Sequence, residues 1–283
     1  MVKVGAHVSI AGSIDRAVER AEEIGCDAFQ IFSRNPRGWR FKEISLEVAE
    51  EFKRKLKRSG MYPPVDHMPY LPNLATPKED VYQKSVEALT VELERCEALG
   101  ISYLVTHLGS HLDAGKEAGL DRTVEAITTA LSATENDVIL LLETTSDSKN
   151  SVGGSFEDLA EIMRRVDRDD RVGACFDTCH VFVAGYELRS EEGLEETMEE
   201  FDRTVGLEKI KVVHLNDSKG PLGSKLDRHE HIGLGEIGEE GFRRILGHPA
   251  IRDLPLILET PSDERRDDRG NIAKVRELAG RVR

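Results

Sequence analysis

The sequence of 283 residues predicts an α/β protein: a single (β/α)8 TIM barrel domain over residues 1–283, with its active site at the carboxyl ends of the strands. Strand-like and helix-like segments alternate along the whole chain, eight strand segments occur, and no linker or shift of composition divides them. An open doubly wound sheet is the alternative, but eight unbroken repeats favour closure into a barrel.

The predicted strands are short segments rich in β-branched residues, and amphipathic helices separate them. The strands cover residues 2–8, 28–32, 64–67, 103–107, 138–143, 172–177, 210–214 and 255–259. Apolar residues at helical spacing indicate three of the helices by the stripes Val48-Phe52-Leu56, Val86-Leu89-Leu93-Cys96 and Leu194-Met198-Phe201-Val205. Ser155 and Asp158 predict a helix start, and helix ends are predicted at Gly25, Gly60, Gly100 and Gly206.

The composition excludes several classes of protein. The N-terminus lacks a signal peptide, and the longest apolar run, 138–142, is too short to span a bilayer, so we expect a cytoplasmic protein without membrane contact. The four cysteines show no CxxC spacing, which predicts neither disulfides nor a thiolate zinc site. A net charge of −14 argues against a broad basic DNA-binding surface, unless some carboxylates bind metal and others lie on outer helices.

Potential metal ligands end one predicted strand after another, at separations of 40, 36, 34, 37 and 45 residues. Each interval is about one βα unit, so these side chains are expected at one rim of the barrel. A lone histidine at a strand end is more often structural, but six ligands in phase favour a shared site. The six are His67, His107, Glu143, Asp177, His214 and Glu259.

Two further segments extend this set: His180 follows Asp177 by three residues, and Asp227 and His229 are expected on a loop after the seventh strand. Imidazoles and carboxylates without cysteine suit zinc, manganese or iron and leave room for water and substrate. Two or three clustered cations favour hydrolysis of phosphate esters. A sugar isomerase or epimerase with two metal ions remains the alternative.

Six segments, in order and at matching spacing, resemble the endonuclease IV family of apurinic/apyrimidinic endonucleases, which have a TIM-barrel fold. The resemblance covers nearly the whole chain. Its motifs are Gly5-Ala6-His7-Val8-Ser9, His107-Leu108-Gly109-Ser110-His111, Cys175-Phe176-Asp177-Thr178-Cys179-His180, His214-Leu215-Asn216-Asp217-Ser218-Lys219, Asp227-Arg228-His229-Glu230-His231-Ile232-Gly233 and Leu258-Glu259-Thr260-Pro261.

The resemblance implies three zinc ions per chain, with manganese an option at one site, and catalytic roles for Glu143 and Glu259. By this resemblance, the first ion is held by His67, His107 and Glu143. Glu143 bridges to the second ion, which Asp177, His214 and Glu259 complete. The third ion is held by His180, Asp227 and His229.

The implied enzyme is a deoxyribonuclease IV, a hydrolase of DNA base excision repair that acts as a monomer. It is expected to cut the phosphodiester bond 5′ to abasic sites in duplex DNA, leaving 3′-hydroxyl and 5′-deoxyribose phosphate ends, and to clean blocked 3′ ends. By resemblance, Arg37, Tyr70 and Leu71 insert into the duplex, since an abasic nucleotide is the easiest to flip. The alternative for Tyr70 and Leu71 is core packing.

Three features depart from the family pattern. Residues 144–149 replace a turn that is usually rich in glycine and alanine, and His231 stands where asparagine is usual. Pro36 and Gly38 flank Arg37 in place of bulkier polar residues. We therefore expect altered DNA contacts in the second and fifth loops and a supporting role for His231.

Overall fold

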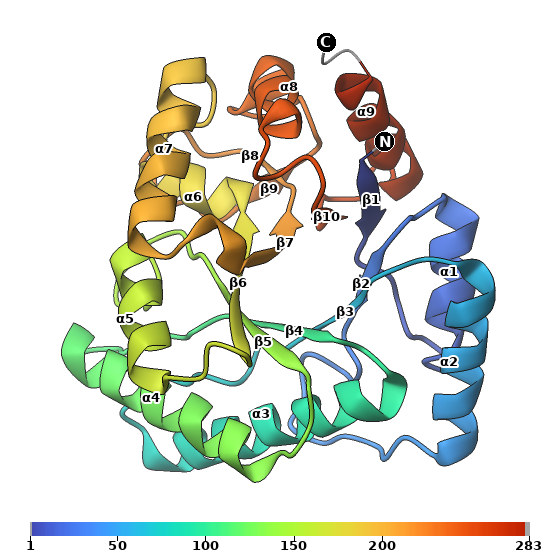
Figure 1. The fold of residues 1–283 in the computed structure, drawn as a ribbon, viewed down its shortest axis with the longest axis vertical. Helices are drawn as coiled ribbons and strands as arrows, with labels where there is room; N and C mark the ends of the chain where they lie inside the picture. The colour runs from blue at the N-terminus through green and yellow to red at the C-terminus, as the bar shows by residue number, and fades with distance from the viewer. Residues whose placement is uncertain (1, 281–283) are drawn as a thin grey trace.

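A computed structural model describes residues 2–280, and its eight parallel strands form a barrel inside a ring of helices (Figure 1). The strand order is β1-β10-β7-β6-β5-β4-β3-β2. The two ends of this sheet meet through the parallel bridge between His7 and Gln30 and through the Val8 amide, which donates to the Gln30 carbonyl at 2.8 Å. The predicted (β/α)8 barrel is therefore confirmed, and the open sheet is not observed.

All eight predicted barrel strands occur; three have the predicted bounds, and the other five are one to three residues shorter than expected. The barrel strands are β1 (Lys3–Ala6), β2 (Phe29–Ile31), β3 (Pro64–His67), β4 (Tyr103–Thr106), β5 (Ile139–Glu143), β6 (Val172–Asp177), β7 (Ile210–His214) and β10 (Pro255–Leu258). The helices are α1 (Arg16–Ile24), α2 (Leu46–Ser59), α3 (Glu79–Leu99), α4 (Lys116–Ala133), α5 (Phe156–Val166), α6 (Thr178–Ala184), α7 (Glu191–Thr204), α8 (Gly238–Gly247) and α9 (Asp268–Ala279), with a 3-10 turn at Leu207–Lys209.

The helix boundaries follow the predicted capping residues with one exception. The Ser155 side chain accepts a hydrogen bond from the Asp158 amide at the start of α5, and Gly25, Gly60 and Gly100 adopt left-handed conformations that end their helices. Gly206 differs: its φ of 97° and ψ of 125° are not left-handed helical, and it follows the true cap of α7 by one residue. It instead opens the 3-10 turn that leads into β7.

Two separate hydrophobic cores hold the barrel. The larger lies between strands and helices, and the smaller fills the barrel axis with one residue from each of seven strand segments. On β1 the corresponding position is Gly5, where a Cβ atom would lie 1.6 Å from the Ala28 carbonyl oxygen. Glycine thus permits the close approach of β1 and β2 that closes the barrel. The inner layer consists of Ala28, Val65, Val105, Leu141, Cys175, Val212 and Ile257.

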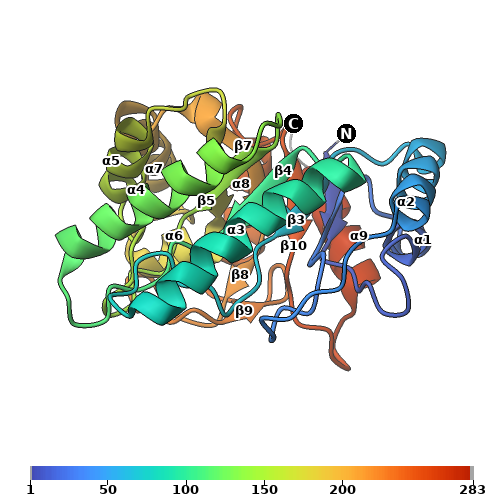
Figure 2. The same ribbon diagram turned by 90° about the horizontal axis from the view of Figure 1, so that it is seen from below.

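A small hairpin, β8 (Asp217–Ser218) with β9 (His229–Glu230), extends the seventh loop beyond the barrel rim and lies at the lower margin of Figure 2. Asp217 stabilises residues 233–237, which follow the hairpin. Its carboxylate accepts hydrogen bonds from the amides of Gly233, Gly235 and Ile237 at 2.9–3.0 Å. The sequence predicts a plain loop here, and strands of two residues are too short to show a periodic pattern.

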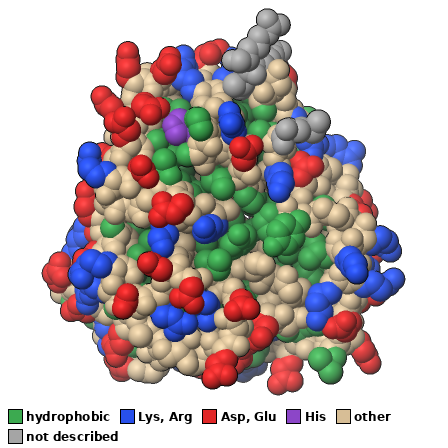
Figure 3. Space-filling model, viewed as in Figure 1, with side chains coloured by type: hydrophobic (Ala, Val, Ile, Leu, Met, Phe, Trp, Pro, Cys, Tyr) green, Lys and Arg blue, Asp and Glu red, His purple; other side chains and the backbone are tan. Residues whose placement is uncertain are grey.

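The outer surface is highly charged. In the view of Figure 3, acidic and basic side chains are interspersed around the rim of the molecule, over the outer helices. Among residues 2–280, no helix is both long and apolar enough to cross a membrane.

Candidate metal centre

A ring of polar side chains lies directly above the inner apolar layer. Side chains alternate along a strand, so the position two residues after each inner-layer residue also faces the barrel axis. The spacing of the strand ends predicts six members of this ring, but it misses Gln30 and gives no role to His7. The same alternation predicts both, because Gln30 lies two residues after Ala28 and His7 two residues after Gly5. The ring consists of His7, Gln30, His67, His107, Glu143, Asp177, His214 and Glu259.

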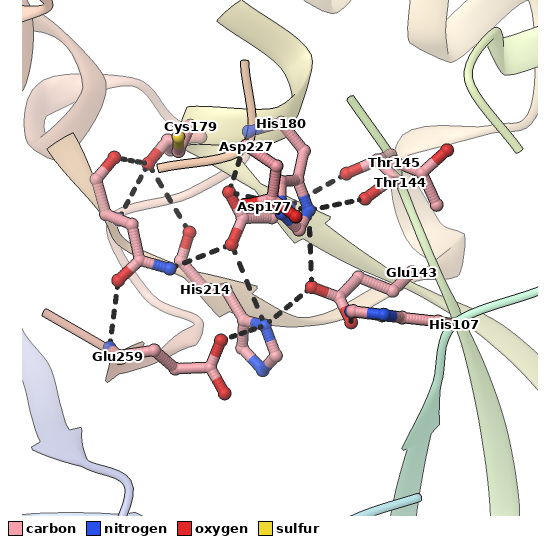
Figure 4. Close-up of polar contacts among 12 residues, drawn as sticks. His107, Glu143, Thr144, Thr145, Asp177, Cys179, His180, His214, Asp227 and Glu259 are labelled. Carbon is pink, nitrogen blue, oxygen red and sulfur yellow. Dashed lines mark hydrogen bonds and ion pairs between the residues drawn. The ribbon is translucent and has the colours of Figure 1, made fainter. Parts of the chain in front are cut away.

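The nine predicted ligands come together in three groups, each with ligand atoms within 4.8 Å of one another. Glu143 connects the first two, because its Oε2 lies 2.9 Å from His107 Nε2 and its Oε1 lies 3.0 Å from His214 Nδ1. Figure 4 shows these side chains converging from different strands. The first group is His67, His107 and Glu143; the second is Glu143, Asp177, His214 and Glu259; the third is His180, Asp227 and His229.

The hydrogen bonds of three histidines leave one ring nitrogen of each available to a metal ion. His229 Nδ1 lies 3.1 Å from the Glu259 carbonyl oxygen, whereas its Nε2 is buried and has no hydrogen-bond partner in the described chain. Such a buried nitrogen is unfavourable without a ligand. In His67 and His180, Nδ1 likewise contacts a backbone carbonyl, at 2.7 and 2.9 Å. A carbonyl only accepts, so each neutral ring is protonated at Nδ1 and offers the Nε2 lone pair to a metal.

The carboxylates create a strongly negative field at the site. Burial alone lowers the pKa of His180, but Asp177, Asp227 and Glu143 outweigh it and raise this pKa to about 10. Burial likewise favours a neutral Glu143, yet His107 and His214 hold its pKa well below the usual range. Without a cation these histidines would therefore bind protons, and divalent cations can replace those protons.

Neighbouring residues fix the orientation of Asp177 and Glu259. Asp177 ends β6 and caps α6, where its Oδ1 accepts from the His180 amide at 2.9 Å; this short helix, absent from the sequence predictions, places His180 one turn away. Asn216 donates to Asp177 Oδ2 and accepts from the Glu259 amide, both at 2.8 Å. Thr144, the first residue of the divergent fifth loop, accepts from the Asp177 amide at 2.9 Å. These contacts preorganise the second and third groups.

Of the predicted DNA-contacting residues, Tyr70 lies beside the metal centre. His7, Phe32 and Tyr70 are among the residues that line a cavity of about 520 Å³ together with His67, His107, His180, Asp227, His229 and Glu259. Tyr70 is 60 % exposed and Leu71 39 % exposed, which excludes the core-packing alternative. Arg37 is exposed as well. The Tyr70 amide donates to the Pro36 carbonyl at 3.1 Å and so joins the second and third loops.

A buried ionic network anchors the loop that carries Arg37. Arg34 forms an ion pair with Glu92 of α3, and both side chains are almost fully buried. Arg95, also on α3, donates to Ser33 Oγ at 2.8 Å and to the Lys42 carbonyl at 2.9 Å. These contacts fix residues on both sides of Arg37, so the exposed arginine projects from a held loop.

Two nearby residues differ from the ligand groups. His231 is buried, and both ring nitrogens have partners: Nε2 lies 3.0 Å from Asp263 Oδ1 and Nδ1 lies 3.0 Å from Asn271 Nδ2. It therefore supports the loop and has no free nitrogen for a metal. Cys179 Sγ lies near Asp177 and His229, but burial raises the pKa of its thiol, which contacts the Arg228 carbonyl at 3.9 Å.

The chain is similar over nearly its whole length to known proteins that share one name. Residues 18–280 match the family described as xylose isomerase-like TIM barrel. The chain is 62 % identical to a protein named probable endonuclease 4 from Methanoculleus marisnigri, over 99 % of this chain and 100 % of that protein. It is 52 % identical to a probable endonuclease 4 from Nitrosopumilus maritimus, over 98 % and 100 %.

Two similar solved structures differ widely in their sequence identity to this chain. Endonuclease IV from Thermus thermophilus superposes with a TM-score of 0.88 at 38 % identity, covering 98 % of this chain and 99 % of that one. A D-tagatose 3-epimerase-like protein superposes with a TM-score of 0.72 at 21 % identity, covering 98 % and 96 %. The second likeness shows the shared fold alone.

The contrast between His229 and His231 gives a direct test of the third group. We expect His229→Ala to lose about one metal ion per chain, because it removes one of three ligands, whereas His231→Ala should keep the full content. Mass spectrometry of metals in gel-filtered protein measures this difference. Equal metal content in the two folded variants would contradict the assignment of His229.

Proposed function

The chain belongs to the endonuclease IV family, and from that membership we propose that it hydrolyses the phosphodiester bond 5′ to abasic sites in duplex DNA. The products are a 3′-hydroxyl and a 5′-deoxyribose phosphate, and removal of blocked 3′ ends is the companion activity. The single observation that carries the proposal is the convergence of the three ligand groups beside an open cavity bordered by Tyr70.

We propose three zinc ions as the resident cofactors, one for each group. Nitrogen and oxygen donors in sets of three or four suit zinc, and Mn²⁺ is an option at one position. Bound divalent cations would offset the phosphate charge, activate water near neutral pH and stabilise the leaving oxygen. All nine proposed ligands come from one chain, so the centre needs no residue of a second subunit, and we propose that the protein acts as a monomer.

We propose that Glu143 and Glu259 are central to binding the phosphate. Glu143 joins the first two groups, and Glu259 belongs to the second group and lines the cavity, so these two carboxylates would hold the cations next to a phosphate bound in the cavity. Asn216 fixes the backbone of Glu259 and the side chain of Asp177, which limits reorganisation during reaction. We assign catalytic importance to Glu143 and Glu259 on this geometry.

We propose that Arg37, Tyr70 and Leu71 recognise the lesion. Two of them are exposed side chains on adjacent residues, and the backbone bond from Tyr70 to Pro36 keeps Arg37 close by. An abasic nucleotide has lost pairing and stacking, so these residues select it through the low cost of flipping without reading sequence. The cations at the centre and the exposed Arg37 compensate locally for a chain of net charge −14.

A sugar isomerase or epimerase on the same barrel is less well supported. The third group and the exposed Arg37, Tyr70 and Leu71 would have no function around a small closed sugar pocket. Full-length relatives at 52–62 % identity carry the endonuclease name, whereas the epimerase-like structure shares 21 % identity.

The catalytic assignment predicts loss of nicking in two variants. Glu259→Gln removes a charged ligand and His229→Ala empties one position, so each should lower the cleavage rate by at least about 100-fold. A duplex with one tetrahydrofuran abasic analogue is the substrate, and gel electrophoresis measures the nicked strand. Glu50→Gln, an exposed change on α2, is the matched control and should cleave at the wild-type rate. Unchanged turnover in Glu259→Gln and His229→Ala would disprove the ligand set.

The recognition assignment predicts a loss of selective binding. Arg37→Ala and Tyr70→Ala should each weaken binding to abasic duplex by about tenfold, or about 1.4 kcal/mol, with metal content unchanged. Arg54→Ala is the control, since Arg54 pairs with Glu51 on the outer helix α2. Fluorescence anisotropy with abasic and intact duplexes measures both affinities. Equal affinity of the wild-type protein for the two duplexes would refute recognition by insertion.

A further inference from the structure

Gln30 is the exception in the polar ring. The other seven members are histidines or carboxylates, whereas Gln30 is a neutral amide that is fully buried. It lies on β2 beside the seam with β1, and its neighbours Phe29 and Ile31 face the outer core. An amide at this inward position must satisfy its hydrogen bonds within the ring.

The amide contacts three ring members at once. Gln30 Oε1 lies 2.8 Å from His214 Nε2, and Gln30 Nε2 lies 2.7 Å from Glu259 Oε1. The same nitrogen lies 3.1 Å from His7 Nδ1. These contacts join β2 to His214, which ends β7, and to His7 and Glu259, which directly follow β1 and β10.

Only one orientation of the amide satisfies these contacts. The carboxylate of Glu259 accepts hydrogen bonds, so the NH₂ group of Gln30 must face it, and the carbonyl of Gln30 must face His214. The reverse orientation would place two acceptors together at 2.7 Å. His214 consequently donates from Nε2, and His7 accepts at Nδ1.

This orientation determines which atoms face the second group. With its proton on Nε2, His214 offers the Nδ1 lone pair, which lies 3.0 Å from Glu143 Oε1 and 3.4 Å from Glu259 Oε2. Because Gln30 holds Glu259 Oε1, the other oxygen, Oε2, is the one directed toward His214 Nδ1. Figure 4 shows His214 and Glu259 facing each other in this arrangement.

We propose that Gln30 is a positioning residue for the metal ion of the second group: one amide selects Nδ1 of His214 and Oε2 of Glu259 as its ligand atoms. Through its bond to Nδ1 it also fixes the neutral His7 ring, which lines the cavity, with the proton on Nε2. The inference rests on the ligand set in the proposed function and is independent of the DNA substrate. Partners of this kind commonly change metal affinity by about 10- to 100-fold.

Metal affinity and the tautomer of His214 test this role. We expect Gln30→Met, which keeps the side-chain length and removes the amide, to weaken the most affected zinc ion by about 10- to 100-fold in competition with a chelator. NMR of ¹⁵N-histidine-labelled, zinc-loaded protein should lose the His214 signal pattern of a protonated Nε2 and metal-bound Nδ1. In Gln30→Glu the new carboxylate still accepts a hydrogen bond from His214 but repels the carboxylate of Glu259. This variant should therefore retain the His214 signal pattern and still bind zinc more weakly.

Asn271→Leu is the matched control. Asn271 is equally buried and its amide contacts the Nδ1 of His231, outside the ligand groups, so its loss should leave zinc affinity unchanged. Wild-type zinc affinity in folded Gln30→Met or Gln30→Glu would overturn the role of Gln30 alone. Absence of bound zinc in the wild-type protein would instead overturn the ligand set on which the proposed function rests.

Discussion

The alternation of side chains along parallel strands is the constraint on which the rest of the structure depends. At one level of the barrel axis the strands contribute a small apolar layer, closed at Gly5 by the close approach of β1 and β2. Two residues later the same strands contribute eight polar groups. The inner apolar layer forms a rigid base, and the polar ring above it places carboxylates and imidazoles where water and substrate can enter.

The position of the polar ring above the apolar layer explains how a chain of net charge −14 can bind DNA at the barrel rim. The negative field of Glu143, Asp177, Asp227 and Glu259 is concentrated at the rim, where it favours the proposed cations. The buried Arg34–Glu92 pair and Arg95 hold the second loop beside that rim, so Arg37 projects from a fixed backbone. Binding energy and chemistry therefore depend on local geometry more than on net charge.

The fold and six ring positions could be predicted because strands and ligands recur with the βα repeat. His180, Asp227 and His229 could be named as candidate ligands from their residue types and their spacing to other ligands, but their assignment to one ion depended on the family resemblance. They lie on α6 and the β8–β9 hairpin, which are too short for periodic patterns. Gln30 was not predicted because an amide carries no metal-ligand signature, and its role comes from partners far apart in sequence. Tyr70 and Leu71 could not be separated from core residues until their exposure was known.

Anomalous X-ray scattering at the zinc absorption edge, from crystals of zinc-loaded protein, tests the central claim most directly. The account predicts three peaks, one within each ligand group, with Glu143 between the first two. Peaks at other positions, or a fully loaded protein whose Glu143, Asp177 and Glu259 side chains point away from every peak, would contradict it.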